Sequence, residues 1–247
     1  MKNKSLIIGS SLFAVAASAS FALADVNQPQ EIIMRPLTTP GSQITVGGDV
    51  VFLIIPDVDM GIGLGLGGSY GVDDKIEVGA SYGLGLAPEF EAKGTLGVEG
   101  AYNIMEGNLS VAANVATGYD LLAEGMADLN VGARVRFRLN DKLAIQSGGS
   151  QLSITLDGDP KPITLGLPVG VAYQASPALH AFVNTNLASI SIADSETVVF
   201  GADFIPLQVG AFFSPSNTMD FGASVAWFDL KEASDTIAIF LSGRLHM

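Results

Sequence analysis

Alternation of apolar and polar residues over Ala127–Leu139 constrains the fold of this chain more than any other feature. The apolar residues take every second position, and the positions between them include Arg134, Arg136 and Arg138. Successive side chains of a β-strand point to opposite faces, so a period of two predicts a strand with one apolar and one polar face. The three arginines then form a column on the polar face.

Segments of this kind recur along the chain. We count about twelve from residue 43 onward, each close to the roughly 9–11 residues of a tilted membrane-spanning strand. In the eighth segment, Pro168 lacks the N–H that a paired strand donates, which predicts a bulge; Pro206 predicts a kink in the tenth. The predicted strands cover residues 43–55, 60–71, 75–86, 93–104, 108–119, 127–139, 142–150, 163–174, 178–187, 198–213, 219–227 and 236–247.

The hydropathy of the chain favours a membrane barrel. A mean hydropathy of +0.41 is too high for an ordinary soluble domain. Yet the longest aliphatic run, Val50–Ile55, is far shorter than the roughly 20 residues of a membrane-spanning helix. A barrel resolves this conflict, because apolar residues face lipid at every second position and closure pairs every backbone group. We therefore predict an all-β fold, an antiparallel up-and-down transmembrane barrel of about twelve strands. A soluble secreted β-sandwich is the alternative fold.

The last predicted strand resembles a known class. Thr236–Met247 alternates up to the end of the chain, with Ile237, Ile239 and Leu241 on one face. It is similar to the closing strand of a Gram-negative outer-membrane β-barrel of the porin-like type. Such strands typically end in an aromatic residue, whereas this one ends in Met247. The resemblance implies that outer-membrane lipid and lipopolysaccharide surround the protein and that the barrel-assembly machinery inserts it.

The N-terminus has the pattern of a cleavable signal peptide. Lys2 and Lys4 precede an apolar run at residues 6–19, and Ala22-Leu23-Ala24 fits a small-x-small cleavage site. This pattern predicts export. The predicted parts are a signal peptide over 1–24, a periplasmic N-terminal segment over 25–42 and the barrel over 43–247. The alternative for residues 25–42 is a partial plug of the barrel.

Connections and aromatic residues support the same topology. Tight turns alternate with longer connections, as in barrels with short periplasmic turns and longer outer loops. A set of outward-facing aromatic residues falls beside the tight turns, at one end of the predicted strands. Aromatic side chains prefer the bilayer interface, so we predict a periplasmic girdle. Its members are Tyr70, Tyr102, Phe137, Tyr173, Phe213 and Phe221.

The composition offers little for catalysis or metal binding. The chain has no cysteine, which leaves neither disulfides nor thiolate metal ligands. Its two histidines, His180 and His246, are predicted to face the lumen near the periplasmic end, without the serine arrangement of an outer-membrane lipid hydrolase. We predict no enzymatic activity, no cofactor and no metal. A net charge of −13 argues against nucleic acid as a partner.

The charged residues that face the predicted lumen are the best candidate site. One interpretation is a charged constriction that selects solutes, in which the arginine column raises the local anion concentration. The other is that the arginines pair with neighbouring acids and fill the lumen. The predicted lining residues are Arg134, Arg136, Arg138, Arg244, Asp128, Glu99, Asp49 and Asp203.

Many other inward positions carry small residues, which predicts some water-filled space in a barrel of about twelve strands. We therefore predict a narrow pore for passive diffusion of small solutes. A structural or adhesin-like barrel is the alternative, favoured if the lumen is packed or plugged by residues 25–42. A lipid hydrolase is a weaker alternative.

Overall fold

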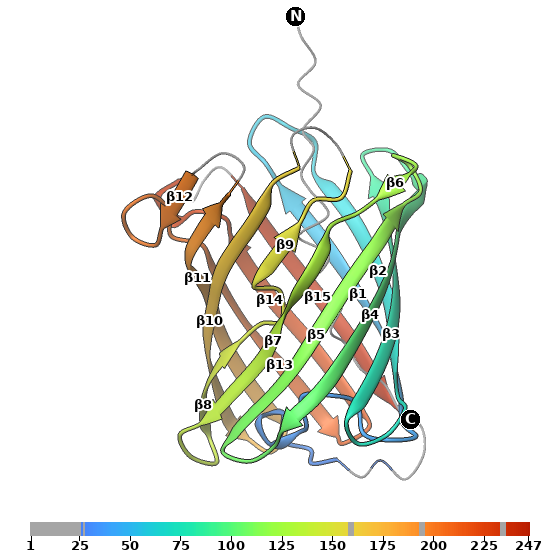
Figure 1. Ribbon diagram of the computed structural model, residues 1–247, viewed down its shortest axis with the longest axis vertical. Helices are drawn as coiled ribbons and strands as arrows, with labels where there is room; N and C mark the ends of the chain where they lie inside the picture. Colours follow the sequence, from blue (N-terminus) through green and yellow to red (C-terminus); the bar gives the residue numbers. More distant parts are fainter. Residues whose placement is uncertain (1–25, 27, 158–160, 193–195, 233–235) are drawn as a thin grey trace, which may run out of the picture.

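The chain forms one antiparallel barrel (Figure 1). The computed structural model describes residue 26 and residues 28–157, 161–192, 196–232 and 236–247; the predicted signal peptide over 1–24 lies outside them. The strands are β1 (Ile44–Ile54), β2 (Gly61–Gly71), β3 (Ile76–Ala87), β4 (Glu91–Met105), β5 (Leu109–Asp120), β6 (Gly125–Met126), β7 (Leu129–Arg138), β8 (Leu143–Ser147), β9 (Leu152–Ile154), β10 (Ile163–Ser176), β11 (Leu179–Ser191), β12 (Glu196–Val199), β13 (Leu207–Ser216), β14 (Met219–Trp227) and β15 (Ile237–His246).

The fifteen strands make twelve wall positions. Strands β8 and β9 are two parts of one wall strand, β6 extends the pairing of β5 beyond β7, and β12 extends the pairing of β11 beyond β13. Strand β1 pairs with both β2 and β15, and β10 pairs with β11, so the wall closes on itself. The predicted antiparallel barrel of about twelve strands is confirmed.

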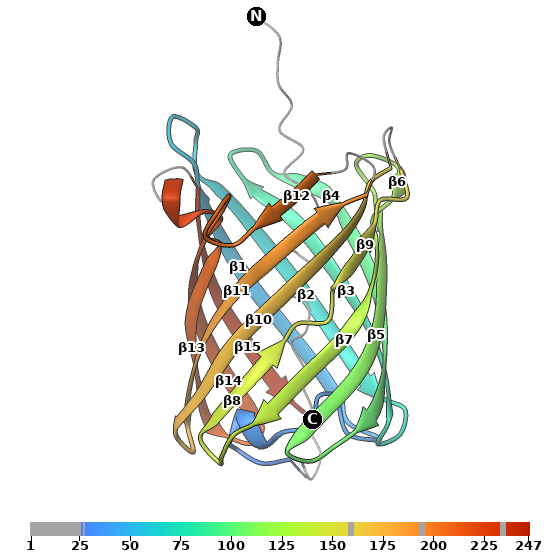
Figure 2. The same cartoon turned by 60° about the vertical axis from the view of Figure 1, so that its left-hand side comes forward.

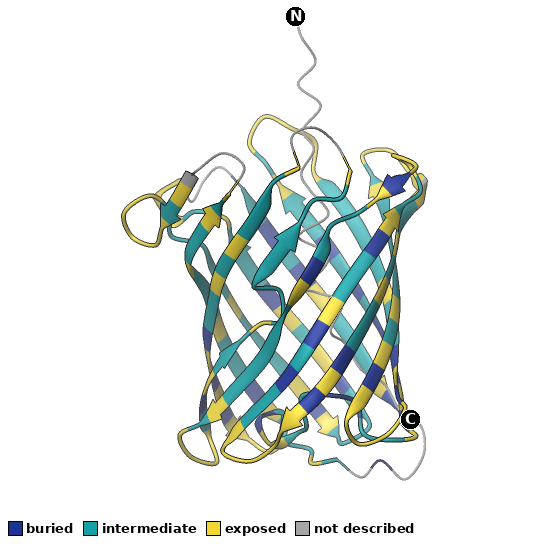
Figure 3. Cartoon of the chain, in the orientation of Figure 1, coloured by how far each residue is buried: buried dark blue, intermediate teal, exposed yellow. Residues whose placement is uncertain are grey.

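The predicted alternation appears as alternating exposure along the wall (Figure 3). In β1, Ile44 and Val46 are exposed, whereas Thr45, Asp49 and Val51 are buried. The lumen therefore takes the polar and small side chains, and the outer surface of the barrel takes the apolar ones. A barrel with this outer surface suits lipid rather than water.

The bulge predicted at Pro168 is present. The register between β10 and β11 shifts between Gly166 and Pro168, which pairs with Asn186. The carbonyl of Pro168 accepts a hydrogen bond from Ser147 Oγ at 2.7 Å. Strand pairing therefore continues on both sides of Pro168, with a shifted register at the residue that lacks an N–H.

The seventh wall strand is interrupted more than the sequence predicts. It breaks between β8 and β9, and Gln151 fills the break with its side chain. The amide oxygen of Gln151 accepts from the N–H of Ala133 at 2.7 Å, and its Nε2 donates to the carbonyl of Ala133 at 2.8 Å. A side-chain amide therefore replaces the missing backbone partner of β7.

The prediction that the tenth strand covers 198–213 is wrong. Residues of β12 pair with β11, and the wall strand β13 begins only after Pro206. Gly201, with a φ of 80°, belongs to the turn between them. Asp203 lies in this turn, exposed, and its Oδ2 accepts from the N–H of Val199 at 2.9 Å. Asp203 is therefore not a lumen residue, because residues 200–206 leave the ladder of β11 between β12 and β13.

The two ends of the barrel differ (Figures 1 and 2). At one end, five tight turns join β2 to β3, β4 to β5, β7 to β8, β10 to β11 and β13 to β14. The last residues of the chain lie at this short-turn end, where Ile44 and Met247 exchange backbone hydrogen bonds. Most connections at the opposite, long-loop end are longer and include β6, β12 and the 3₁₀ turn η3 (Leu230–Glu232).

The six predicted girdle residues all lie at the short-turn ends of their strands, exposed on the outer surface. Phe213 and Phe221 face each other directly across β13 and β14. Within the described residues, no helix has the length and apolar character needed to cross a membrane.

Candidate functional site: the barrel lumen

The residues before β1 cross the lumen at the short-turn end (Figures 1 and 2). We call residues 26 and 28–42 the N-terminal segment; it includes the 3₁₀ turn η2 (Ile32–Met34). Its start is fixed to the β13–β14 turn, where Asn217 Nδ2 donates to the carbonyl of Val26 at 2.9 Å and Gln28 Nε2 donates to the carbonyl of Asn217 at 3.1 Å. From there its side chains and backbone reach lumen residues on several strands.

Arg35 fixes the segment to β14. Its guanidinium forms a bidentate pair with Asp220, with Nη1–Oδ2 at 2.7 Å and Nη2–Oδ1 at 3.1 Å. Asp220 is fully buried and also accepts from Ser214 Oγ, and His246 Nε2 lies 2.7 Å from its Oδ2. The remaining donors of Arg35 bind the segment's own carbonyls at Pro29 and Gln30. These hydrogen bonds stabilise the pair, because Asp220 has no exposed surface and the Arg35 side chain is only 8% exposed.

Ile33 is the apolar contact of the segment with the wall. Its side chain is 1% exposed and packs against Ala144 of β8 and Ala172 of β10, both fully buried. Its N–H donates to Gln174 Oε1 at 3.2 Å. The two alanines leave the space that a branched side chain fills.

Arg134 links the segment to β3 and β4. Its Nη1 donates to Glu77 Oε1 at 2.8 Å and to the carbonyl of Leu37 at 3.0 Å, and its Nη2 donates to Glu99 Oε2 at 3.1 Å. The other oxygen of Glu77 accepts from the N–H and the hydroxyl of Thr39, at 2.6 and 2.7 Å. Glu77 is 2% exposed, so this carboxylate is shared between the wall and the segment.

Arg136 and Arg138 bind the backbone and a side chain of the segment. Nη1 of Arg136 donates to the carbonyls of Ile32, Ile33 and Arg35, the last at 2.8 Å. These are carbonyls of η2 and of the residue that ends it; among them, the carbonyl of Ile32 also accepts from the N–H of Arg35 at 3.2 Å. Arg138 approaches Met34 Sδ through Nη1, and its Nη2 donates to the carbonyl of Gly107 at 2.8 Å.

The structure thus places the three predicted arginines in one lumen column, where their partners are carboxylates of the wall and carbonyls of the N-terminal segment and the β4–β5 turn. Arg134 pairs with Glu77 and Glu99, but Arg136 and Arg138 bind mainly carbonyl oxygens. Sequence reasoning missed Glu77, Asp220 and Arg35. The sequence does contain signals for them. Alternation places Glu77 and Asp220 on the lumen face of their strands, and Arg35 is the only Lys or Arg in the segment.

Arg244 lies elsewhere on the wall. Its guanidinium carbon lies 4.1 Å from the ring centroid of Phe212, which in turn stacks on Phe182 with centroids 5.7 Å apart. This arrangement is a cation–π contact on lumen side chains of β11, β13 and β15.

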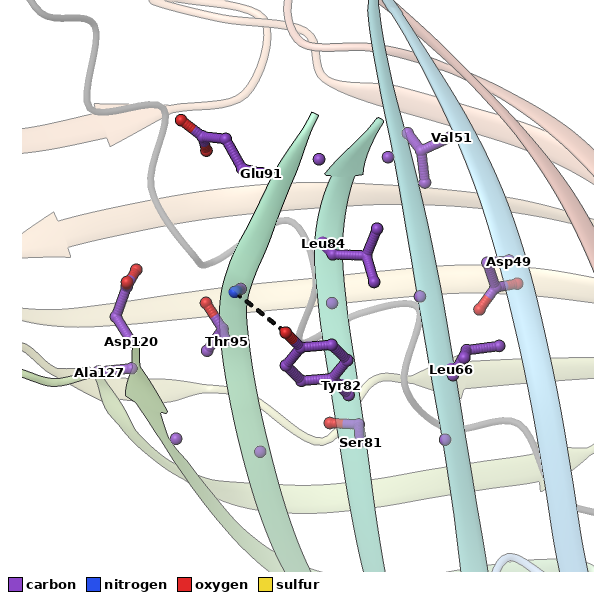
Figure 4. A pocket seen from close by; sticks show the side chains of 18 of the residues that line it. Asp49, Val51, Leu66, Ser81, Tyr82, Leu84, Glu91, Thr95, Asp120 and Ala127 are labelled. Carbon is purple, nitrogen blue, oxygen red and sulfur yellow. Dashed lines mark hydrogen bonds between the residues drawn. The ribbon is translucent and has the colours of Figure 1, made fainter. Parts of the chain in front are cut away.

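Nearer the long-loop end, the lumen holds a cavity of about 610 Å³ (Figure 4). Glycines of β2, β3, β4 and β5 form much of its wall, so few side chains reach inward there. Among the residues that the structure describes, its charged lining consists of five carboxylates and one ammonium group. These are Asp49, Glu91, Glu99, Asp120 and Asp128, with Lys93.

A second cavity of about 150 Å³ lies beside the segment at the short-turn end, lined in part by Arg35, Glu106 and Arg138. The two cavities share no lining residue. Along β7 and the residues before it, Asp128 and Asn130 line the larger cavity and Arg138 lines the smaller one. Arg134 and Arg136, which hold the segment, lie between them.

The two histidines take structural positions. His180 Nδ1 lies 3.2 Å from Gln174 Oε1, and His246 lies against Asp220. Ser214 donates its hydroxyl to Asp220 and not to a histidine. Over the described part of the chain, no cluster of three or more His, Cys, Asp or Glu residues could hold a metal ion.

Neither protein-family models nor curated protein sequences match this chain. Solved structures do. The NanC porin has 9% identity and a TM-score of 0.59, with 81% of this chain and 98% of that chain covered. An outer-membrane channel from Pseudomonas putida F1 has 12% identity, a TM-score of 0.56 and coverage of 84% and 96%. The KdgM porin has 11% identity, a TM-score of 0.51 and coverage of 81% and 98%. The chain therefore shares the barrel architecture of outer-membrane porins.

Proposed function

We propose that this protein is a narrow outer-membrane pore for the passive diffusion of small solutes. The observation that carries this proposal is the cavity of about 610 Å³ inside a closed barrel of twelve wall strands. A barrel of about eight strands is just filled by its side chains, so twelve strands with a glycine-rich wall leave room for water. The porin architecture of NanC and KdgM supports the same function.

The proposed location follows from the surface of the barrel. The exposed apolar residues face lipid, and the aromatic girdle lies at the bilayer interface of the short-turn end. Short turns face the periplasm in bacterial barrels, so this end is the periplasmic one. Residues 1–24 act as a signal peptide removed after Ala24, and lipopolysaccharide and the barrel-assembly machinery are the partners of the exported barrel.

A second candidate is a structural or adhesin-like barrel without transport. The N-terminal segment favours it, because the segment crosses the lumen and contacts several strands. A pore must provide a path past this segment, whereas a structural barrel needs none. The two candidates have the same barrel fold, and they differ in whether the protein conducts solutes.

Planar-bilayer recording of the purified mature protein distinguishes them. A diffusion pore gives discrete conductance steps after insertion, in proportion to the amount of protein added. Folding is verified separately by the heat-dependent shift of barrels in gel electrophoresis. A folded barrel that inserts into the bilayer and gives no steps at any voltage supports the structural candidate instead.

A further inference from the structure

We propose that the lumen contains a binding site for the chain's own N-terminal segment, and that solutes pass only when the segment leaves this site. The inference rests on the proposed pore function. The segment is the plug, and the site consists of Arg134, Arg136, Asp220 and the pocket for Ile33. The arginine column then serves to hold the plug in place more than to select ions.

The contacts of the segment extend across the lumen rather than along one wall. Asp220 belongs to β14 and binds Arg35, whereas Glu77 belongs to β3 and binds Thr39. Between them, Ile33 occupies its pocket on β8 and β10, and Arg136 of β7 holds the carbonyls of η2. A segment fixed at such widely separated strands lies in the path of a solute.

The two cavities show where that path is interrupted. The larger cavity belongs to the outer half of the lumen and the smaller one to the periplasmic end. They share no lining residue, and Arg134, bound to Leu37 and Glu99, lies between their levels. The seated segment and the arginines that bind it thus lie along the barrel between the two cavities.

Release of the segment leaves the barrel intact. Its anchors described above involve side chains of the segment or of the wall, whereas the paired register of β1 with β2 and β15 begins at Ile44 and Thr45. Just before it, Ser42 and Gln43 form backbone hydrogen bonds with Gly71 of β2. The segment joins the wall at Gly41 and Ser42, where Gly41 bridges Gly71 and Ser42 has a φ of 62°. This junction is the point about which the segment can swing toward the periplasm.

A reversible lock tests the inference in the full mature chain. The chain has no cysteine, so the pair Ile33→Cys and Ala172→Cys, whose parent side chains pack together, introduces the only thiols. Under oxidising conditions the disulfide holds the segment in its site, and we expect at least a tenfold lower mean conductance than after reduction. Each single-cysteine variant serves as the control and should not respond to reductant. Equal conductance of the locked and the reduced protein overturns the inference.

A second variant acts in the opposite direction and needs no disulfide. Arg136→Met removes the donor to three carbonyls of the segment, and we expect the open fraction to rise by about tenfold. Arg138→Met is the matched control on the same strand, since Arg138 makes one carbonyl contact to the β4–β5 turn and one contact to Met34. It should change the open fraction much less.

The outcomes separate the two proposals. The first outcome is conductance steps of equal size and frequency in the wild type, Arg136→Met, Arg138→Met and the oxidised double-cysteine protein. It would mean that the segment does not close the pore, so this inference would be wrong while the pore function stands. Folded protein without steps in any of these forms shows that the pore function itself is wrong, and the inference fails with it.

Discussion

The guanidinium of Arg35 forms a bidentate pair with the carboxylate of Asp220, with contacts of 2.7 and 3.1 Å, although 185 residues separate them in the chain. Asp220 is 0% exposed, and it also accepts a hydrogen bond from Ser214. This pair joins a segment without regular alternation to the barrel wall. Removing one partner of a buried pair leaves the other charge uncompensated, so the position of the segment depends on both.

Arg35→Lys should loosen the segment without unfolding the barrel. Lysine keeps the charge but cannot form the bidentate pair or reach the carbonyls of Pro29 and Gln30 at the same time. Hydrogen bonds to charged groups contribute about 1.5–3 kcal/mol each. We expect the amide of Ile33, which donates to Gln174, to exchange with deuterium about tenfold faster or more.

Hydrogen-exchange mass spectrometry in nanodiscs measures this effect on the peptide that contains Ile33. Peptides from β7 and β10 in the same sample are the control, because their ladders do not involve the segment. An unchanged exchange rate at Ile33 would contradict the role given to Arg35.

The two faces of β7 should respond differently to a charge. Val131 is 37% exposed on the outer surface, where an arginine near the bilayer midplane costs about 2–4 kcal/mol of folding free energy. Asn130 lines the larger cavity next to Asp128, so Asn130→Arg places its charge in water near a carboxylate. Urea titration in lipid vesicles should show a much larger loss for Val131→Arg. Equal losses of folding free energy would mean that the assignment of Val131 to the outer surface and Asn130 to the lumen is wrong.

The accessible charges of the outer cavity should favour cations. Among the described residues, Asp49, Glu91, Asp120, Asp128 and Lys93 line it, together with Glu99, which pairs with Arg134. Because Glu77 also pairs with Arg134, this cluster adds no excess positive charge, and carboxylates predominate in the cavity. We therefore expect reversal potentials at low salt to indicate cation preference, opposite to what an exposed arginine column predicts. The preference should weaken at 1 M salt, where the Debye length is about 3 Å.

Asp49→Asn combined with Asp128→Asn should reduce this cation preference. Asp203→Asn is the matched control, because Asp203 lies in the exposed turn before β13 and outside the cavity. If the control shifted the reversal potential as much as the double variant, the cavity would not be the source of selectivity.

The mature protein should begin at Asp25. The signal-peptide pattern ends at Ala24, and Val26, two residues later, is held by Asn217. Mass spectrometry of the intact protein from outer-membrane preparations measures the mass of the chain directly. A retained Met1 would contradict the predicted processing, and a cut well beyond Asp25 would remove the start of the segment.

The sequence by itself determined the barrel. Alternation with a period of two is a local property, so it identifies the strands and which face of each is apolar without knowledge of the partners. The same property identified the bulge at Pro168, because a missing N–H disturbs a ladder wherever the strand lies. It failed at Asp203, where alternation was read through a turn that leaves the ladder between β12 and β13.

Only the tertiary structure decided which lumen residues meet. Alternation places Arg134, Glu77 and Asp220 on the inner face, but closure and the stagger between strands decide the height and direction at which each points. The N-terminal segment shows no periodicity, and it takes its position from contacts with residues far away in the chain, such as Asp220 and Arg136. Those contacts depend on a closed wall, because only closure brings β3, β7, β10 and β14 around one lumen.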